Sequence, residues 1–329
     1  MPDRFLNLTG GTAMIASDLH GDRDAFDRCL RRFAALRESG QAERIIFLGD
    51  LIHGDGQPHD DASLSMILDM MALREQLGPD AVIMLLGNHE MPHIYGVTLT
   101  RGSLDFTPRF EHALGPHRDA VIAFLNSLPF YVRTAAGVML SHAGPSPDVI
   151  AHADLLREFS HQEVLEQVEA VLNQVEDTSE LTEQYRLLAG VPYDEMAREY
   201  LAISGPDDPR YLHLLRGFLV GRQSREFNVL WAALFTLNER GLSPTSYRNS
   251  CRAFLEAFSE DAPVEQRAIV SGHIATPRGG HTLVNDYHLR IASATHARPR
   301  EQGEYLLLDC AAPVRSASDL LGGLRNLFE

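Results

Sequence analysis

Five apolar stretches of this chain each end in side chains that can bind a metal ion or move a proton. These side chains are Asp18 with His20, Asp50, Asn88 with His89, His142, and His273. Carboxylates, imidazoles and an amide oxygen, with no thiolate among them, suit manganese, iron or zinc. A single histidine or aspartate after a strand is usually a hydrogen-bonded turn residue. Because the coincidence occurs five times, the pattern predicts a metal centre.

The elements that must position these side chains are predicted to be buried strands. Apolar runs begin at Thr12, Arg44 and Ala81 and stop at the candidate ligands, which is typical of core strands. Apolar residues at helical spacing follow the first two runs. A hairpin over 130–141 and a run over 267–271 supply the remaining strand ends. Sites in open α/β sheets lie at the carboxyl ends of the strands, so we expect an α/β fold with the ligands at one edge.

The ligands are numerous enough for two metal ions that share one carboxylate. Asp18 and His20 are two residues apart, so in an extended chain they point to the same side. Asn88 can ligate through its amide oxygen, and His89 can ligate or exchange a proton near neutral pH. Two ions about 3.5–4 Å apart can clamp a phosphoryl group and activate a water for in-line attack. The set therefore favours phosphate chemistry.

Composition excludes several other classes of protein. All 29 basic residues are arginines, which excludes P-loop and Schiff-base chemistry because both require lysine. The net charge of −16 argues against a nucleic-acid binder. Three widely spaced cysteines indicate a reduced compartment, and neither a signal peptide nor a membrane-spanning apolar run is recognisable. We therefore expect a cytoplasmic protein without a membrane partner.

The middle of the chain differs in composition from the rest. Residues 154–200 carry twelve acidic and three basic residues, a net charge of −9. We interpret roughly 150–228 as a helical insertion in a single domain over 1–329, serving as a lid or as a surface for a protein partner. A solvated acidic face is the alternative interpretation for most of these charges. Further strands are predicted over 282–284, 289–292 and 304–308, and an amphipathic helix over 317–328.

The polar motifs, taken in order, resemble those of the calcineurin-like metallophosphoesterases. They are DLHG at 18–21, GD at 49–50, GNHE at 87–90, SHAG at 141–144 and GH at 272–273. Within the family the chain looks most similar to the phosphoprotein-phosphatase (Ser/Thr) branch. The details that favour this branch are Glu90, Ala275 after GH, and the later runs VLW, NERG, LRIASATH and GEYLLLD. Many small-molecule phosphodiesterases of the family have a second histidine at the position of Ala275. The long segment from GNHE to SHAGP resembles the bacterial Shewanella-like phosphatases.

The resemblance implies a role for each matching residue. Asp18 and His20 would bind the first metal, Asp50 would bridge the two metals, and Asn88, His142 and His273 would complete the second. His89 would be the general acid that protonates the leaving alkoxide. Arg240 of NERG would grip the phosphate oxygens, as a guanidinium does well, with Arg248 as the rival. The other interpretation of Arg240 is a surface arginine in a turn.

One segment departs from the pattern of that branch, which has Asp-x-x-Asp-Arg-Gly after the second strand. Here His53 replaces the aspartate that orients the general acid, and Gly54 replaces an arginine that binds phosphate. Asp55 could reach His89 from a shifted loop, and Arg101 could supply the missing charge. The loss weakens the stabilisation of transition-state charge, which is usually the largest contribution to catalysis.

The resemblance implies a metallophosphatase β-sandwich of two mixed sheets flanked by helices. It also implies a phosphatase with two divalent ions, manganese by preference and iron or zinc as alternatives. The substrate would be a phosphorylated protein or a small phosphate ester. The altered loop and the insertion favour, as a second hypothesis, a dinucleoside polyphosphate or another phosphodiester. The third hypothesis is a non-catalytic scaffold, which we rank last because every metal ligand is retained.

Overall fold

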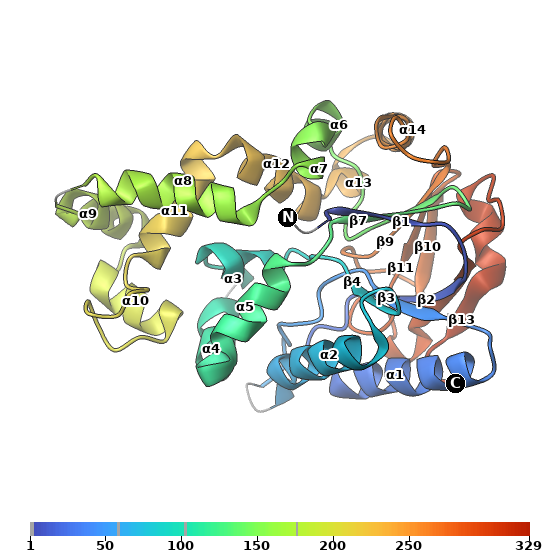
Figure 1. Cartoon of the computed structure of the whole chain (residues 1–329), viewed down its shortest axis with the longest axis horizontal. Coiled ribbons are helices and arrows are strands. Elements are labelled where there is room, and N and C mark those ends of the chain that lie inside the picture. The colour runs from blue at the N-terminus through green and yellow to red at the C-terminus, as the bar shows by residue number, and fades with distance from the viewer. Residues whose placement is uncertain (1–2, 58–59, 102–103, 176) are drawn as a thin grey trace. The chain divides into compact units, whose positions relative to one another are not determined.

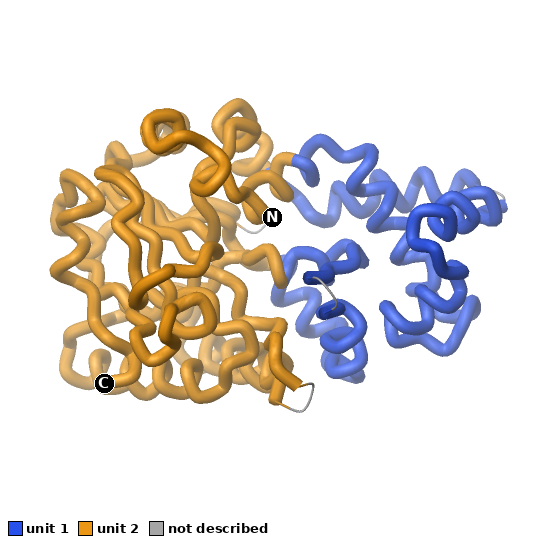
Figure 2. Tube along the Cα trace, turned by 180° about the vertical axis from the view of Figure 1, so that it is seen from behind, with its two compact units in different colours: residues 1, 90–126, 159–228 blue, residues 2–89, 127–158, 229–329 orange. Residues whose placement is uncertain are grey.

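The computed structural model describes residues 3–57, 60–101, 104–175 and 177–329. Glu176, one of the acidic residues of the predicted insertion, lies outside these ranges. The chain divides into two compact units, which Figure 2 colours separately. Unit 1 consists of residues 90–126 and 159–228, and unit 2 contains the rest of the described chain. Within the described ranges, every helix is too short or too polar to cross a lipid bilayer.

Unit 2 contains two mixed β-sheets. In spatial order the first sheet consists of β1 (Phe5–Leu8), β7 (Tyr131–Thr134), β8 (Val138–Ser141), β9 (Ala268–Ser271), β11 (His288–Ile291) and β10 (His281–Asn285). The second consists of β13 (Leu324–Asn326), β12 (Glu304–Asp309), β2 (Thr12–Ala16), β3 (Arg44–Phe47) and β4 (Val82–Met84). Strands β2, β3 and β4 are parallel neighbours, and so are β8, β9 and β11. Each sheet therefore brings several carboxyl ends to one edge.

The main core lies between the two sheets. Ile15, Ile46 and Ile83 are aligned across β2, β3 and β4 and are buried together with Leu140 and Val270, which are paired across β8 and β9. Alternate residues of a strand face opposite sides, so the residues between them point away from this core. The two apolar layers meet as the inner faces of a sandwich.

Helices cover the outer faces of both sheets in unit 2. Helix α1 (Arg23–Glu38) and helix α2 (Ser63–Leu77) lie along the second sheet (Figure 1), where the ring centroids of Phe26 and Phe47 are 6.0 Å apart. Helix α14 (Pro244–Ala257) packs on the first sheet, and the ring of Phe254 contacts Tyr131. The shorter helices of this unit are α6 (Pro147–Ala151), α7 (Ala153–Arg157), α13 (Asn238–Gly241), η3 (Arg300–Gln302) and η4 (Ala317–Gly323). The fold is thus two mixed sheets flanked by helices, as predicted.

Unit 1 is almost entirely helical. Its elements are α3 (Met91–Tyr95), the short hairpin β5 (Thr100–Arg101) and β6 (Leu104–Asp105), α4 (Phe106–Leu114), η2 (Gly115–His117), α5 (Arg118–Asn126), α8 (His161–Asn173), α9 (Ser179–Ala189), α10 (Tyr193–Leu201) and α11 (His213–Gln223). Helix α12 (Arg225–Leu234) begins in unit 1 and ends in unit 2. Helices α8 to α11 form this unit together with residues 90–126, while residues 150–158 belong to unit 2.

The chain ends differ from the sequence prediction. The amphipathic helix predicted over 317–328 is wrong in its second half, because η4 ends at Gly323 and the chain continues as β13, which pairs with β12. The amino-terminal strand β1 was not predicted. It pairs with β7 at the edge of the first sheet and is only partly buried, so its sequence lacks the continuous apolar character of a core strand.

Candidate metal centre

The structure brings the predicted ligands of both sheets together in unit 2. Asp18 and His20 follow β2, Asp50 follows β3, and Asn88 with His89 follows β4. From the other sheet, His142 follows β8 and His273 follows β9. Each position is the carboxyl end of a strand that has a parallel neighbour. The loops after five strands therefore converge on one place.

The backbone is strained where the ligands stand. Among the described residues, six non-glycine residues have a positive φ, and five of them lie in this cluster: Asp18, His20, Asp50, His53 and His273, with φ between 47° and 72°. Side chains disfavour this left-handed conformation, which costs of order 1–3 kcal/mol at each residue. Such strain persists only where the surrounding fold imposes it, and it is concentrated at functional sites.

Two glycines let the loops approach one another. A Cβ atom on Gly49, whose φ is +100°, would lie 2.8 Å from the Cα of Gly87 and 2.9 Å from Nδ1 of His142. A Cβ atom on Gly272 would collide with the side chains of Ser17 and Asp18. The glycines of the GD and GH motifs are therefore needed for close packing between the two sheets' loops.

One group of side chains, here called the second ligand group, consists of Asn88, His142 and His273. Oδ1 of Asn88 lies 2.8 Å from Nε2 of His142 and 2.8 Å from Nδ1 of His273. Nδ1 of His142 donates to the carbonyl of Leu48 at 2.9 Å, so Nε2 is the nitrogen that is left for a ligand. Oδ1 of Asp50 lies 3.6 Å from this Nε2 and accepts a hydrogen bond from the backbone N–H of His89.

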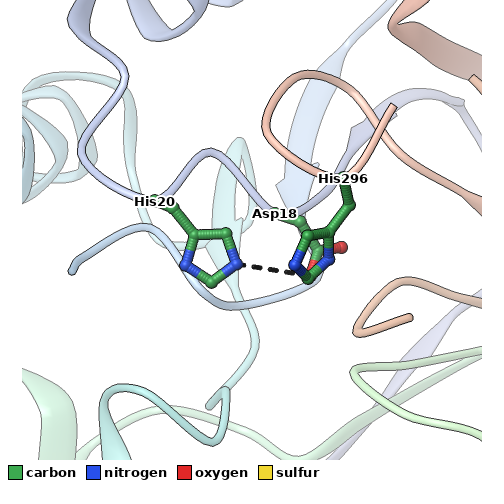
Figure 3. A group of neighbouring side chains, drawn as sticks. All are labelled: Asp18, His20 and His296. Atoms are coloured by element: carbon green, nitrogen blue, oxygen red, sulfur yellow. Dashed lines mark ion pairs between the residues drawn. The ribbon is translucent and has the colours of Figure 1, made fainter. Parts of the chain in front are cut away.

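The first ligand group consists of Asp18, His20 and His296. Nε2 of His20 lies 3.9 Å from Oδ1 of Asp18 and 3.6 Å from Oδ2 of Asp50. Figure 3 shows His296 beside the same carboxylate, with its Nδ1 3.0 Å from Oδ1 of Asp18. The ligand atoms of the three side chains lie within 4.8 Å of one another. Asp50 lies close to both groups and has 1% of its surface exposed.

His296 is the residue of this cluster that the sequence analysis missed. It belongs to the run LRIASATH, which served only to support the family resemblance. The signal that predicted the other ligands is also present here, because the apolar strand β11 is followed within five residues by a histidine. The intervening residues Ala292, Ser293 and Ala294 are buried, so the strand end is not obvious from the sequence.

The protonation of the cluster suits metal binding. Burial, with a smaller effect from His142, lowers the pKa of His273 to about 3. Burial also lowers the pKa of His142 below its ordinary value. Burial alone would raise the pKa of Asp18, but the charges of His296, His142 and His20 outweigh it and lower that pKa. At neutral pH the aspartate is therefore ionised and these two imidazoles are neutral, which is the state in which they bind metal.

A divalent cation fits this donor set. Nε2 of His273 and Nδ1 of His296 are buried and make no hydrogen bond of acceptable geometry. Neutral His142 directs its lone pair at Nε2 towards Oδ1 of Asn88 and Oδ1 of Asp50, which are also lone-pair atoms. Buried polar atoms that face one another in this way require a shared cation or proton. Imidazole, carboxylate and amide donors suit manganese, iron and zinc.

His89 and the altered loop after Asp50 lie beside the ligands. Nδ1 of His53 is 3.0 Å from Nδ1 of His89, and the ring centroids of His20 and His89 are 4.6 Å apart. Burial, followed by the charges of His20 and His53, lowers the pKa of His89 well below its ordinary value. Asp55 is exposed on the same loop and borders a pocket beside His20. His53 thus occupies the contact that the motif pattern gives to an aspartate.

The candidate phosphate-binding arginines have different surroundings. Arg240 is exposed on α13. Arg248 forms a surface ion pair with Asp286, with an N–O distance of 2.7 Å, and its guanidinium lies over the ring of Tyr287. Arg101 belongs to unit 1, where it lies over the ring of Phe106.

Residues 11–290 match the family model of the calcineurin-like phosphoesterases. The chain belongs to this family, which confirms the resemblance seen in its motifs. It is therefore a metal-dependent hydrolase of phosphate esters, and clusters of aspartate and histidine are present for divalent ions. No curated protein matches the chain significantly in sequence.

Solved structures with a similar fold include phosphatases of low sequence identity. A single-residue mutant of a cold-active protein tyrosine phosphatase is 18% identical, with a TM-score of 0.52 over 94% of this chain and 78% of the other. The cold-active protein-tyrosine phosphatase of a psychrophilic Shewanella is 19% identical, with a TM-score of 0.45 and the same coverage. A protein serine/threonine phosphatase from Saccharomyces cerevisiae is 14% identical, with a TM-score of 0.48 over 94% and 77%. Of these three, the mutant phosphatase has a TM-score above 0.5, and at 18% identity its similarity to this chain concerns the fold alone.

Proposed function

We propose that this protein is a phosphomonoesterase with two divalent metal ions, acting on a phosphorylated protein or a small phosphate ester. The observation that carries the proposal is the convergence of strained loops from both sheets on Asp50, with one ligand group on each side of it. Asp18 and His20 would hold one ion, Asn88, His142 and His273 would hold the other, and Asp50 would contact both. Manganese is the preferred ion for this oxygen-rich and nitrogen-rich set.

When bound, the ions would polarise the phosphate and activate a water for in-line attack. The chain's own contribution to bond cleavage is the proton of His89. The Nδ1 atoms of His53 and His89 are 3.0 Å apart, and one proton between them fixes the orientation of the His89 ring. With Nδ1–H of His89 donated to His53, Nε2 can protonate the leaving alkoxide only from the doubly protonated imidazolium, which gives up its Nε2 proton and becomes neutral. The lowered pKa of His89 makes this imidazolium a strong proton donor. His53 is then the positioning residue in place of the aspartate of the motif.

Arg240 is the arginine that we propose for the phosphate oxygens. Its neighbours in α13 are tied to the metal centre: Nδ2 of Asn238 donates to the carbonyl of Pro145, three residues after His142, and Glu239 pairs with Arg290. Arg290 is buried at the end of β11, where burial lowers its pKa to about 10 and the nearby charge of Asp18 partly offsets this effect. Helix α13 is therefore anchored beside the site while Arg240 is exposed. Arg248, which is paired with Asp286, is the weaker candidate.

Hydrolysis of an aryl phosphate by the metal-loaded protein tests the proposal. We expect activity that is lost on chelation and restored by manganese. His89→Ala should lower kcat by about 10²–10⁴-fold, the usual contribution of a general acid. His117→Ala, which changes an exposed histidine, is the matched control and should have no effect. Full activity in His89→Ala would contradict the assignment of the general acid. A metal-replete protein that hydrolyses no phosphate ester would instead support the scaffold hypothesis.

A phosphodiester such as a dinucleoside polyphosphate is the second candidate substrate. A pocket of about 320 Å³ beside His20 is bordered by Arg298 and Arg300, where additional phosphates would lie. The same pocket is also bordered by four aspartates, which would repel them: Asp22, Asp55, Asp60 and Asp61. Ion pairs with Asp22 and Asp24 fix Arg300, and Arg298 is exposed. The ratio of kcat/KM for diadenosine tetraphosphate to that for a phosphopeptide separates the two candidates, and Arg298→Ala should lower only the former if this candidate holds.

A further inference from the structure

The two ligand groups are unequal when only the predicted ligands are considered. Without His296, the first ion would have Asp18, His20 and the shared Asp50, whereas the second would have Asp50 and three further side chains. The neighbouring loop after β9 offers no second imidazole, because residue 275 is alanine. Another imidazole nevertheless lies at the first group, and it comes from the loop between β11 and β12.

We infer that His296 is a further ligand of the first metal ion. Its Nδ1 lies 3.0 Å from Oδ1 of Asp18 but makes no hydrogen bond of acceptable geometry, and 14% of the side chain is exposed. The ring centroids of His20 and His296 are 4.8 Å apart, and Figure 3 shows both rings beside the Asp18 carboxylate. A buried nitrogen directed at a carboxylate and an imidazole without bonding either has the position of a metal ligand.

The loop that carries His296 is anchored to the loops of the other ligands. The backbone carbonyl of His296 accepts hydrogen bonds from the N–H and the hydroxyl of Thr276, at 2.9 and 3.2 Å. The hydroxyl of Thr295 donates to the carbonyl of Leu19, which lies between Asp18 and His20. Ser293 and Ser17 are joined by two further hydrogen bonds. The imidazole is therefore placed before a metal arrives, which is how a preorganised ligand is built.

An alternative role for His296 would be to orient Asp18 from outside the coordination sphere. Removal of such a partner typically weakens metal binding by 10–100-fold, whereas loss of a ligand should exceed this range and affect one ion selectively. The number of imidazoles bound to the metals also differs between the two roles. The inference depends on the metal centre of the proposed function, and metal binding can be measured without any substrate.

The experiment compares metal binding by the wild-type chain and three variants. Metal-free protein is titrated with cobalt(II), bound metal is counted by mass spectrometry, and imidazole ligands are counted by X-ray absorption. In His296→Ala we expect one ion to bind as in wild type, the other more than about 100-fold more weakly, and one imidazole fewer at saturation. His296→Asp, which restores a ligating group, should recover binding of the first ion. His281→Ala is the matched control, since it removes a histidine that pairs with Glu304 at 2.6 Å outside the metal centre.

Several outcomes would overturn the inference. They are two ions bound with wild-type affinity in His296→Ala, an equal loss of both ions, or an unchanged imidazole count at saturation. If His296→Ala does not fold, His296→Leu fills the same space without a ligand atom and should show the same selective loss. Failure of the phosphatase proposal would be visible separately, as a wild-type protein that binds two ions but hydrolyses nothing.

Discussion

The two ligand groups beside Asp50 are held in different ways. In the second group, Oδ1 of Asn88 lies within hydrogen-bonding distance of both His142 and His273, and the carbonyl of Leu48 fixes the ring of His142. In the first group, Asp18 accepts hydrogen bonds from the Ser17 hydroxyl and from the backbone N–H of His273. The imidazoles of His296 and His20 lie 3.0 and 3.9 Å from its Oδ1 without a hydrogen bond to it.

The two groups also differ in how strongly they need a cation to balance their buried polar atoms. In the second group one contact needs no metal, because Nδ1–H of His273 can donate to Oδ1 of Asn88, whereas Nε2 of His142 faces the same oxygen with a lone pair. The first group is a buried carboxylate facing imidazoles, so its balance depends on a cation or a proton between them. We therefore expect the first group to lose its metal more readily than the second. Substitutions of Asp50, His142 and the buried His288 test this comparison, and their expected effects decrease in that order.

Asp50→Asn should have the largest effect, because it changes the one carboxylate that lies near both groups. The amide keeps an oxygen but lacks the charge that balances two dications. We expect kcat to fall by more than about 10³-fold and the content of both ions to drop at limiting metal. Activity assays with metal counting check this. A variant that loses only one ion would show that Asp50 serves a single group.

His142→Ala should break the second group alone. It removes the ligand that the carbonyl of Leu48 orients and leaves Asp18, His20 and His296 in place. We expect the loss of one ion and a fall in kcat of about 10²–10³-fold. Metal counting beside His296→Ala is the measurement, because the two variants should retain different ions. Cobalt spectra that are identical in the two variants would mean that the groups are not independent.

Acid should destabilise the metal-free protein through histidines outside the groups as well. His288 is buried in contact with Ser271 and Tyr247. Burial lowers its pKa to about 3. This histidine stays neutral in the folded chain but gains a proton in the unfolded chain below about pH 6.5. Its contribution is therefore present above pH 6.5 and lost as pH falls towards 3, by about 2 kcal/mol at pH 5.

Chemical denaturation at pH 7 and pH 5 measures this smallest effect. His288→Gln should reduce the difference in unfolding free energy between the two pH values by about that amount. The same difference in the variant and the wild type would show that acid acts through the ligand histidines instead. Saturating metal serves as the control, since it opposes protonation of the ligands but not of His288.

The predicted strands are confirmed where an apolar run stops at a polar residue, while the roles of these residues as ligands stay predictions. Asp18, Asp50 and His142 each follow an apolar strand, and a strand end is a local feature that the sequence displays. The contact between His53 and His89 required the structure, because it depends on how the loop bends at His53, where φ is positive. The helix predicted over 317–328 was wrong for a related reason, because β13 is stabilised by its pairing with β12 rather than by its own sequence pattern.

Sequence alone determined which chemical groups are available and at which strand ends they stand. That information is local, since it depends on apolar runs, glycines and the residues that follow them. Only the tertiary structure decided that His296 lies beside Asp18, because the pairing of β12 with β2 and the bonds between Ser17 and Ser293 join segments about 280 residues apart. The same packing separates Arg240 on α13 from Arg248 at its ion pair with Asp286. Contacts over such distances depend on sheet order and register, which single-strand patterns do not specify.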